Sequence, residues 1–135
     1  MSNPVTGHAP SLDDLAEIAG RAFTALPEIF RRLAGEVVIR VDDFPEEDVL
    51  ADLGIEDPFG LTGLYSGVSL AERSGFGAEP EPSRIFLYRR PILDEWAENG
   101  EVTLEELVTH VLIHEIGHHF GLSDPDIDAI EARID

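Results

Sequence analysis

The chain has 135 residues, of which 43% are hydrophobic, and this length and composition predict one globular domain. Acidic residues number 28 against 9 basic ones, and the formal net charge of −19 argues against nucleic acid and anionic membranes as partners. The absence of cysteine excludes disulfides and thiolate metal sites, so a metal ion would need His, Asp, Glu or water as ligands.

The first ten residues are expected to form a disordered tail, and residues 11–135 a single domain. The tail has neither a basic start nor an apolar run, so we do not expect a signal peptide. No stretch of the sequence is long and apolar enough to span a membrane. The expected location is therefore the cytoplasm, and the oligomeric state stays open.

The domain is expected to begin with an amphipathic helix. Ser11 and Asp14 have the spacing of a capping box, although Asp stands where Glu or Gln is usual. Apolar residues then recur at three- and four-residue spacing through residues 12–33. Pro27 should kink or restart the helix, and Gly35 should end it.

Three segments have the composition and patterning of strands: residues 36–42, 64–70 and 84–89. The acidic region after the first of them predicts one short helix near residues 46–53. Residues 71–83 are rich in Gly, Pro and Glu and predict a mobile loop. A short helix over residues 91–98, with Pro91 in its first turn, should follow the third strand. The fold class is therefore α+β.

A long helix is expected from the capping box Thr103-Leu-Glu-Glu106 to a stop at Gly121. Its apolar residues cover more than half of the helical circumference, which predicts that most of it is buried. Gly117 in its middle costs roughly 1 kcal/mol relative to Ala and so indicates a close approach of another segment. Asp124-Pro125 should start a final helix that reaches about residue 134.

The buried helix carries the run His114-Glu115-Ile116-Gly117-His118. Residues four apart lie on one face of a helix, so His114 and His118 present two imidazoles to one metal ion. Glu115 is rotated by about 100° from His114 and can flank the ion without binding it. This is the H-E-x-x-H arrangement of a zinc peptidase, in which the glutamate takes a proton from a water molecule that zinc has acidified.

A catalytic zinc site takes three protein ligands and leaves one position open. Gly121 permits a sharp turn after the helix, which can bring Asp124 back towards His118. The competing interpretation makes Asp124 only the N-cap of the final helix, although a carboxylate has two oxygens and can both cap and coordinate. Asp128 and Glu131 on that helix are the substitute ligands.

Five other aromatic or imidazole residues are considered for a role at the site. His110 lies one turn before His114, where we expect an exposed histidine rather than a residue supporting the ligands. His119 is expected to be structural. Tyr65 and Tyr88 are the only tyrosines that a peptidase of this kind could use to stabilise an oxyanion, but packing is the usual role of an aromatic residue in a strand. Trp96 is expected to anchor its short helix.

The residues HEIGHHFGLSD (114–124), with LYSGVSL and RIFLYRRPI as weaker matches, resemble zincin metallopeptidases. The closer resemblance is to small bacterial zincin-like proteins with a minimal fold. It implies a short three-stranded sheet packed against the N-terminal helix and the H-E-x-x-H helix, with a peptide extended along an edge strand. Carried over by position, it makes His114, His118 and Asp124 the zinc ligands and Glu115 the general base.

The sequence also departs from the larger zincin families. The only methionine is Met1, so no methionine turn lies beneath the metal, and only 11 residues follow Asp124, too few for a C-terminal lobe. Two imidazoles and a carboxylate also suit iron, cobalt or nickel.

Three functions therefore stay open. We expect a zinc-dependent peptidase acting on a peptide or protein substrate of unknown specificity. The alternative is a zinc-binding module that is weakly active or inactive and needs a partner to complete its cleft. The third possibility is a metal-free structural or regulatory domain.

Overall fold

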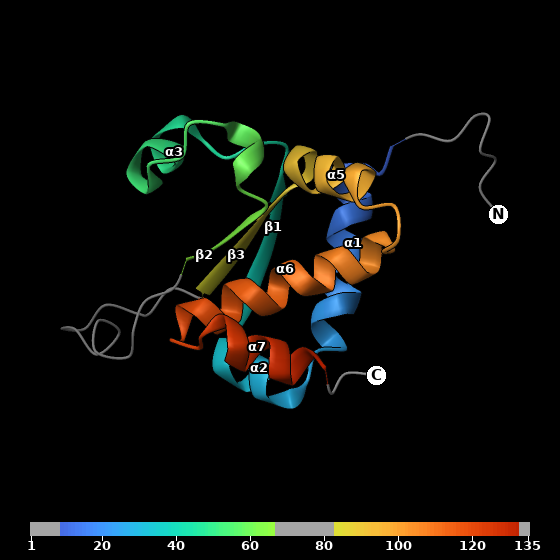
Figure 1. Ribbon diagram of the computed structural model, residues 1–135, viewed down its shortest axis with the longest axis vertical. Helices are drawn as coiled ribbons and strands as arrows, with labels where there is room; N and C mark the ends of the chain where they lie inside the picture. The colour runs from blue at the N-terminus through green and yellow to red at the C-terminus, as the bar shows by residue number, and fades with distance from the viewer. Residues whose placement is uncertain (1–8, 67–82, 133–135) are drawn as a thin grey trace.

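The computed structural model describes residues 9–66 and 83–132, and confirms an α+β fold (Figure 1). Within these residues the sheet has three strands, β1 (Val37–Asp42), β2 (Gly63–Ser66) and β3 (Ser83–Tyr88). The strand order is β1-β3-β2, with β3 parallel to β1 and antiparallel to β2. The short strand β2 therefore forms one edge of the sheet.

The first helical region is split in two, as Pro27 indicated. Helix α1 (Leu12–Thr24) begins with the expected capping box, in which the Ser11 hydroxyl accepts from the backbone of Asp14 at 3.0 Å. Helix α2 (Glu28–Ala34) starts directly after Pro27, because proline cannot donate the backbone hydrogen bond that a continuous helix needs. Gly35 ends α2 with a φ of 63°, a left-handed value that glycine adopts without strain.

The strand boundaries differ from expectation at four points, the first of which is that β1 begins at Val37, one residue later than expected. β2 begins at Gly63, one residue early, and the rest of the expected strand, residues 67–70, lies outside the described residues, as do residues 71–82 of the expected loop. Ser83, expected in that loop, is buried as the first residue of β3. Arg89, expected in the strand, instead starts helix α5 (Arg89–Glu98). Its side chain binds the carbonyl of Pro10 through Nε at 2.6 Å and Asp43 through Nη1 at 3.0 Å.

One face of the sheet packs against α1 and helix α6 (Leu104–His119). Ser83, Ile85 and Leu87 alternate along β3 and point into this core, which also contains the fully buried Leu112. Burying a side chain of the Ile or Leu type stabilises the fold by about 1.5–3 kcal/mol relative to leaving it exposed. As expected, Trp96 anchors α5, because its indole N–H donates to the carbonyl of Val102 at 3.1 Å.

In Figure 1 the strands lie between α1 and helix α3 (Glu47–Leu53), which is followed by a 3-10 turn at Pro58–Gly60. A cavity of about 110 Å³ adjoins α3 and the second face of the sheet; it is lined by Asp42, Glu46, Val49, Leu64, Phe86 and Tyr88. Among the described residues, no helix has the length and apolar character needed to cross a membrane.

Candidate metal centre

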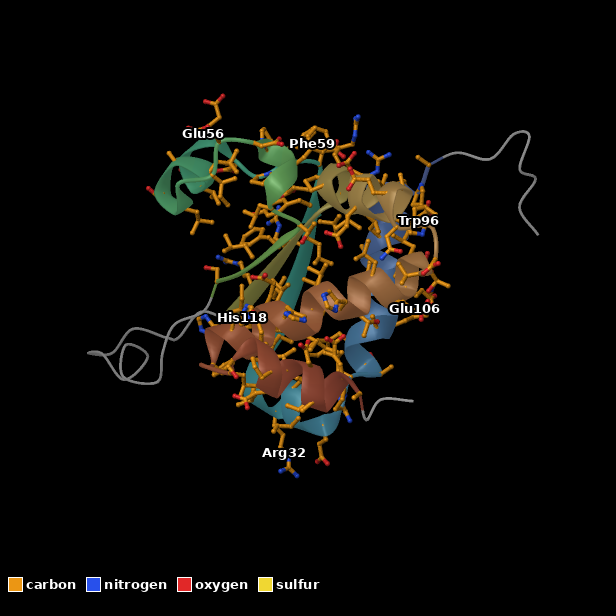
Figure 2. The ribbon with its side chains drawn as sticks, in the orientation of Figure 1. Arg32, Glu56, Phe59, Trp96, Glu106 and His118 are labelled. Carbon is orange, nitrogen blue, oxygen red and sulfur yellow. The ribbon has the colours of Figure 1, made fainter. Side chains whose placement is uncertain are left out.

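Helix α6 positions the predicted metal ligands. Its N-terminus is closed by a capping box, in which the Thr103 hydroxyl accepts from the backbone of Glu106 at 3.0 Å and the Glu106 carboxylate accepts from the backbone of Thr103 at 2.9 Å. Figure 2 shows Glu106 near this end and His118 near the other. The buried apolar residues of α6 fix its rotation about its own axis, so His114 and His118 lie away from the core.

The chain reverses direction just after His118. The backbone N–H of Leu122 donates to the carbonyl of Gly117 at 2.9 Å, and that of Gly121 donates to the carbonyl of His118 at 3.1 Å. These two bonds are the Schellman pattern of a helix end, in which Gly121 takes a left-handed φ of 84°. The turn leads directly into helix α7 (Asp124–Glu131), which is therefore folded back along α6.

The N-cap of α7 differs from the competing interpretation, in which Asp124 capped this helix. Ser123, and not Asp124, is the N-cap, and its hydroxyl accepts from the backbone of Asp126 at 3.2 Å. The Asp126 carboxylate returns a bond to the backbone of Ser123, also at 3.2 Å, which completes a capping box. Because Ser123 satisfies the helix end, the carboxylate of Asp124 stays available to other groups.

Gly117 brings α7 close to α6, as its mid-helix position predicted. A Cβ atom at residue 117 would lie 2.7 Å from Cδ1 and 2.8 Å from Cγ1 of Ile127, which is fully buried. Asp124, Ile127 and Glu131 have i, i+3, i+7 spacing and share one face of α7. Seating Ile127 against Gly117 therefore turns the carboxylates at both ends of α7 towards the histidines of α6.

The structure brings together the three residues predicted to be ligands. Nε2 of His118 lies 2.6 Å from Oδ1 of Asp124, and Nδ1 of His114 lies 3.9 Å from the same oxygen. One ligand atom from each of the three side chains lies within 4.8 Å of the others. His114 is 19% exposed, His118 49% and Asp124 70%, so this group opens towards solvent on the Asp124 side. The donor set of two imidazole nitrogens and a carboxylate oxygen fits a catalytic zinc ion.

A second group of side chains shares His114. Oε1 of Glu131 lies 3.2 Å from Nε2 of His114, and Oε2 lies 3.1 Å from Nδ1 of His110. The rings of His110 and His114 are 4.1 Å apart between centroids. His110 is about half exposed, as expected, but it is also paired with a carboxylate. Asp128, the other substitute ligand, belongs to neither group.

Glu115 is enclosed between α6 and the edge strand β2. A Cβ atom at residue 63 would lie 3.4 Å from Cγ of Glu115 and 2.7 Å from Cγ1 of Val111, so Gly63 allows the strand to approach the helix. Burial raises the pKa of Glu115, whereas a hydrogen bond from the backbone N–H of Tyr65 and the nearby His118 oppose that rise. The net effect is a carboxylate that is more basic than one in water.

The remaining aromatic residues of this region are packed together. The ring of Tyr65 lies 4.1 Å from that of His119 and 5.8 Å from that of Phe120, so His119 has the expected structural role. Burial lowers the pKa of His119. The Tyr65 hydroxyl is buried and has no hydrogen-bond partner among residues 9–66 and 83–132. Tyr88, which lines the cavity on the second face of the sheet, is also buried. Its burial, and to a smaller extent the charges of acidic neighbours, raises its pKa to about 12.

Three features of the site are not evident in the sequence. Gly63 gives no signal of its own, because a glycine before an apolar strand is also an ordinary turn residue. The hydrogen bond to Glu115 comes from the backbone of Tyr65, which any residue except proline would supply. The contact of Glu131 with two histidines is only weakly indicated by the sequence, because its spacing of seven residues from Asp124 places both carboxylates on one helix face.

Comparison with known proteins points to the same chemistry. A family model described as zincin-like metallopeptidase matches residues 34–134. This span runs from the end of α2 through α7 and includes both groups of side chains around His114. A search among curated proteins found none that matches. The family match extends over most of the sequence, and the chain therefore belongs to the zincin-like metallopeptidase family.

Proposed function

We propose that this protein is a zinc-dependent peptidase in which Glu115 acts as the general base. The observation that carries the proposal is the position of a partly buried carboxylate, whose pKa burial raises, on the helix that holds two imidazoles close to an aspartate and near enough to His118 to feel its charge. A general base works best when its pKa is close to the working pH, and burial moves Glu115 in that direction.

The ligands in this proposal are His114, His118 and Asp124. Their atoms are already close together, and the contacts between His118 and Asp124 would open slightly to admit an ion. A bound zinc ion supplies Lewis-acid chemistry, since it polarises a carbonyl group and lowers the pKa of water. Zinc is the metal that family membership implies.

Glu115 carries the proton transfers. Its carboxylate takes a proton from water while the water oxygen forms a bond to the carbonyl carbon of the substrate. It then gives the proton to the leaving nitrogen as the C–N bond breaks, so that the base is regenerated. The backbone N–H of Tyr65 binds the Glu115 carboxylate, which restricts its rotation and keeps it directed at the site.

The substrate in this proposal is a peptide in extended conformation beside β2. This strand is a sheet edge, and Tyr65 within it contacts both Glu115 and the end of α6. A peptide that adds to a sheet edge gains main-chain hydrogen bonds and presents alternate side chains to the two faces. Such a peptide would pass close to Glu115, because Gly63 of the same strand lies against it.

The test compares Glu115→Gln with Glu105→Gln, an exposed glutamate on the same helix. Both variants should bind one zinc ion per chain, whereas His118→Ala and Asp124→Ala should lose it. Hydrolysis of a broad peptide library should fall by about 100-fold or more in Glu115→Gln alone. Unchanged hydrolysis in that variant would exclude this mechanism. Zinc-dependent stability without any cleavage by the wild type would favour the alternative, a binding module without turnover.

A further inference from the structure

We propose that the cavity between α3 and the second face of the sheet binds the side chain of an arginine from the peptide or protein on which this chain acts. That this partner is a substrate rests on the proposed function, whereas the binding of arginine is a property of the cavity alone. The cavity is lined by none of the residues of the candidate metal centre, so its binding can be measured with or without a metal ion.

The cavity combines carboxylates with apolar walls. Its lining consists of two carboxylates, two aliphatic side chains and two aromatic rings: Asp42, Glu46, Val49, Leu64, Phe86 and Tyr88. A calcium ion takes six to eight oxygen ligands, and this lining has too few. A side chain with an apolar stem and a cationic end matches both parts of the lining. The volume of about 110 Å³ lies below the roughly 300–1,000 Å³ of pockets for whole small molecules, so its size suits one side chain.

The aromatic wall favours a planar cation. The rings of Phe86 and Tyr88 are nearly parallel, at 6°, with centroids 6.5 Å apart. A guanidinium group stacks on such rings, whereas the compact ammonium group of lysine is less suited to do so. Tyr88 is only 3% exposed, and its hydroxyl has no hydrogen-bond partner among residues 9–66 and 83–132. The five N–H donors of a guanidinium group can satisfy this oxygen as well as the carboxylates.

The two carboxylates of the cavity have no ion-pair or hydrogen-bond partner within the described part of the chain, whereas two residues that lie between them in sequence have arginine partners. Asp43 pairs with Nη1 of Arg89 at 3.0 Å. The guanidinium carbon of Arg90 lies 5.8 Å from the centre of the Phe44 ring. The chain thus supplies its own arginines to one carboxylate and one aromatic ring of this segment. The cavity offers the same combination of groups to an arginine from outside.

The charge around the cavity also favours a basic ligand. Residues 41–66 include eight acidic residues and no Lys, Arg or His. Arg40 precedes them on β1, but it neither lines the cavity nor forms an ion pair with the carboxylates there. Clustered charges of one sign attract a ligand of the opposite sign, and screening is incomplete within about 8 Å at physiological salt. The negative potential therefore attracts an arginine side chain and disfavours an acidic one.

The cavity lies near the proposed general base, on the other face of the sheet. Leu64 of the edge strand β2 lines it, and the preceding residue, Gly63, lies against Glu115. Burial raises the pKa of Tyr88, and the charges of acidic residues, Glu115 among them, raise it further. Successive residues of an extended peptide point to opposite faces, so a peptide beside β2 would direct one side chain towards Glu115 and its neighbour across Leu64. Adjacent strands are about 4.8 Å apart, so only a long side chain reaches past Leu64 into the cavity.

The decisive measurement is peptide binding to the full chain, with a chelator present so that no peptide is cleaved. The probes are dansyl-labelled octapeptides of Ala and Thr that differ in one central residue, which is Arg, its uncharged analogue citrulline, or Glu. Fluorescence anisotropy gives the dissociation constants. We expect the Arg peptide to bind about 10-fold more tightly than the citrulline peptide, and the Glu peptide to bind more weakly than both.

Variants of α3 locate the binding. Glu46→Gln keeps the shape of an exposed side chain but removes its charge, and it should lower the preference for Arg over citrulline from about 10-fold to about 2-fold. Val49→Phe fills the cavity without a change of charge and should have the same effect. Glu47→Gln, an exposed change outside the cavity, is the matched control and should leave the preference unchanged. Equal affinities for the Arg and citrulline peptides would overturn the proposal. Equal losses in Glu46→Gln and Glu47→Gln would also overturn it, because they would indicate attraction by overall charge alone.

A cleavage assay separates this proposal from the proposed function. In the presence of zinc, kcat/KM should be about 10-fold higher for the Arg peptide than for the citrulline peptide, and Glu46→Gln should remove most of that difference. If the chain bound the Arg peptide preferentially but cleaved no peptide, the proposed function would fail and the arginine cavity would stand. If it cleaved peptides without a preference for Arg in either assay, the arginine cavity would fail alone.

Discussion

Replacing Gly117 by Ala tests how α7 is held against α6. In an unobstructed helix, this change stabilises the fold by about 1 kcal/mol, because Ala has the higher helix propensity. Here the new methyl group would lie 2.7 and 2.8 Å from two carbons of Ile127, well inside van der Waals contact. Ile127 is fully buried and has little room to withdraw, and overpacking of this kind costs about 1–3 kcal/mol.

We therefore expect Gly117→Ala to lower the free energy of unfolding of the metal-free protein by about 1 kcal/mol. The matched control is Gly20→Ala in α1, where a Cβ atom would meet nothing within 4 Å, and this variant should gain about 0.5–1 kcal/mol. Urea denaturation measures both changes. Zinc affinity should fall only in Gly117→Ala, because displacement of α7 moves Asp124 and Glu131 away from the histidines.

A double-mutant cycle identifies the cause. When Ile127 is replaced by Ala, the obstructing carbons are absent, and the added Gly117→Ala change should be neutral or stabilising by up to about 1 kcal/mol. If Gly117→Ala alone were as stabilising as Gly20→Ala and left zinc affinity unchanged, the proposed contact between the two helices would be wrong.

Three further predictions concern other contacts. Ser123→Ala should lower the free energy of unfolding by about 1 kcal/mol and also weaken zinc binding, because it removes the N-cap of α7. Thr103→Ala, at the distant end of α6, should lower the free energy of unfolding by a similar amount in urea denaturation but leave zinc binding unchanged. Equal zinc affinities of the two variants would contradict this prediction. The pKa of Tyr88 in the folded protein, about 12, lies above its ordinary value of 10.0, so the unfolded chain releases this proton at a lower pH. The free energy of unfolding should therefore fall as the pH rises from 10 to 12. Tyr88→Phe should lose less stability over that interval, and parallel pH curves for the two proteins would refute the assignment. Glu105→Gln removes an ion pair with Arg21 whose side chains are both more than half exposed; the free energy of unfolding should stay unchanged within the error of urea denaturation, and a clear loss would show that solvent screening has been overestimated.

The helical parts of the site were predictable because their signals are local. The capping box at Thr103, the apolar periodicity of α6 and the stop at Gly121 all depend on residues within a few positions of one another, and the structure contains each of them. The spacing of His114 and His118 similarly specifies that they share one face. The turn after Gly121 then limits where Asp124 can lie, and that residue is found beside both histidines.

The features that were not predicted depend on distant segments or on close local alternatives. Strand order and register are set by contacts between residues far apart in sequence, such as Tyr65 opposite Ile85. The boundary between β3 and α5 falls inside a continuous run in which neither Tyr88 nor Arg89 is a strong stop signal. Ser123 and Asp124 are both good N-cap residues, and only the pairing of Ser123 with Asp126 decides between them.

The length of α7 has a consequence for which changes the chain can accept. Asp124 and Glu131 are seven residues apart, which is nearly two full helical turns, so both face α6. Inserting or deleting one residue between them would rotate Glu131 by about 100° relative to Asp124. Related sequences should therefore vary freely in the identity of exposed residues such as Ala129 but keep the number of residues in this interval constant. In this helix the spacing of the carboxylates, more than the chemical nature of the residues between them, determines whether the histidines keep their partners.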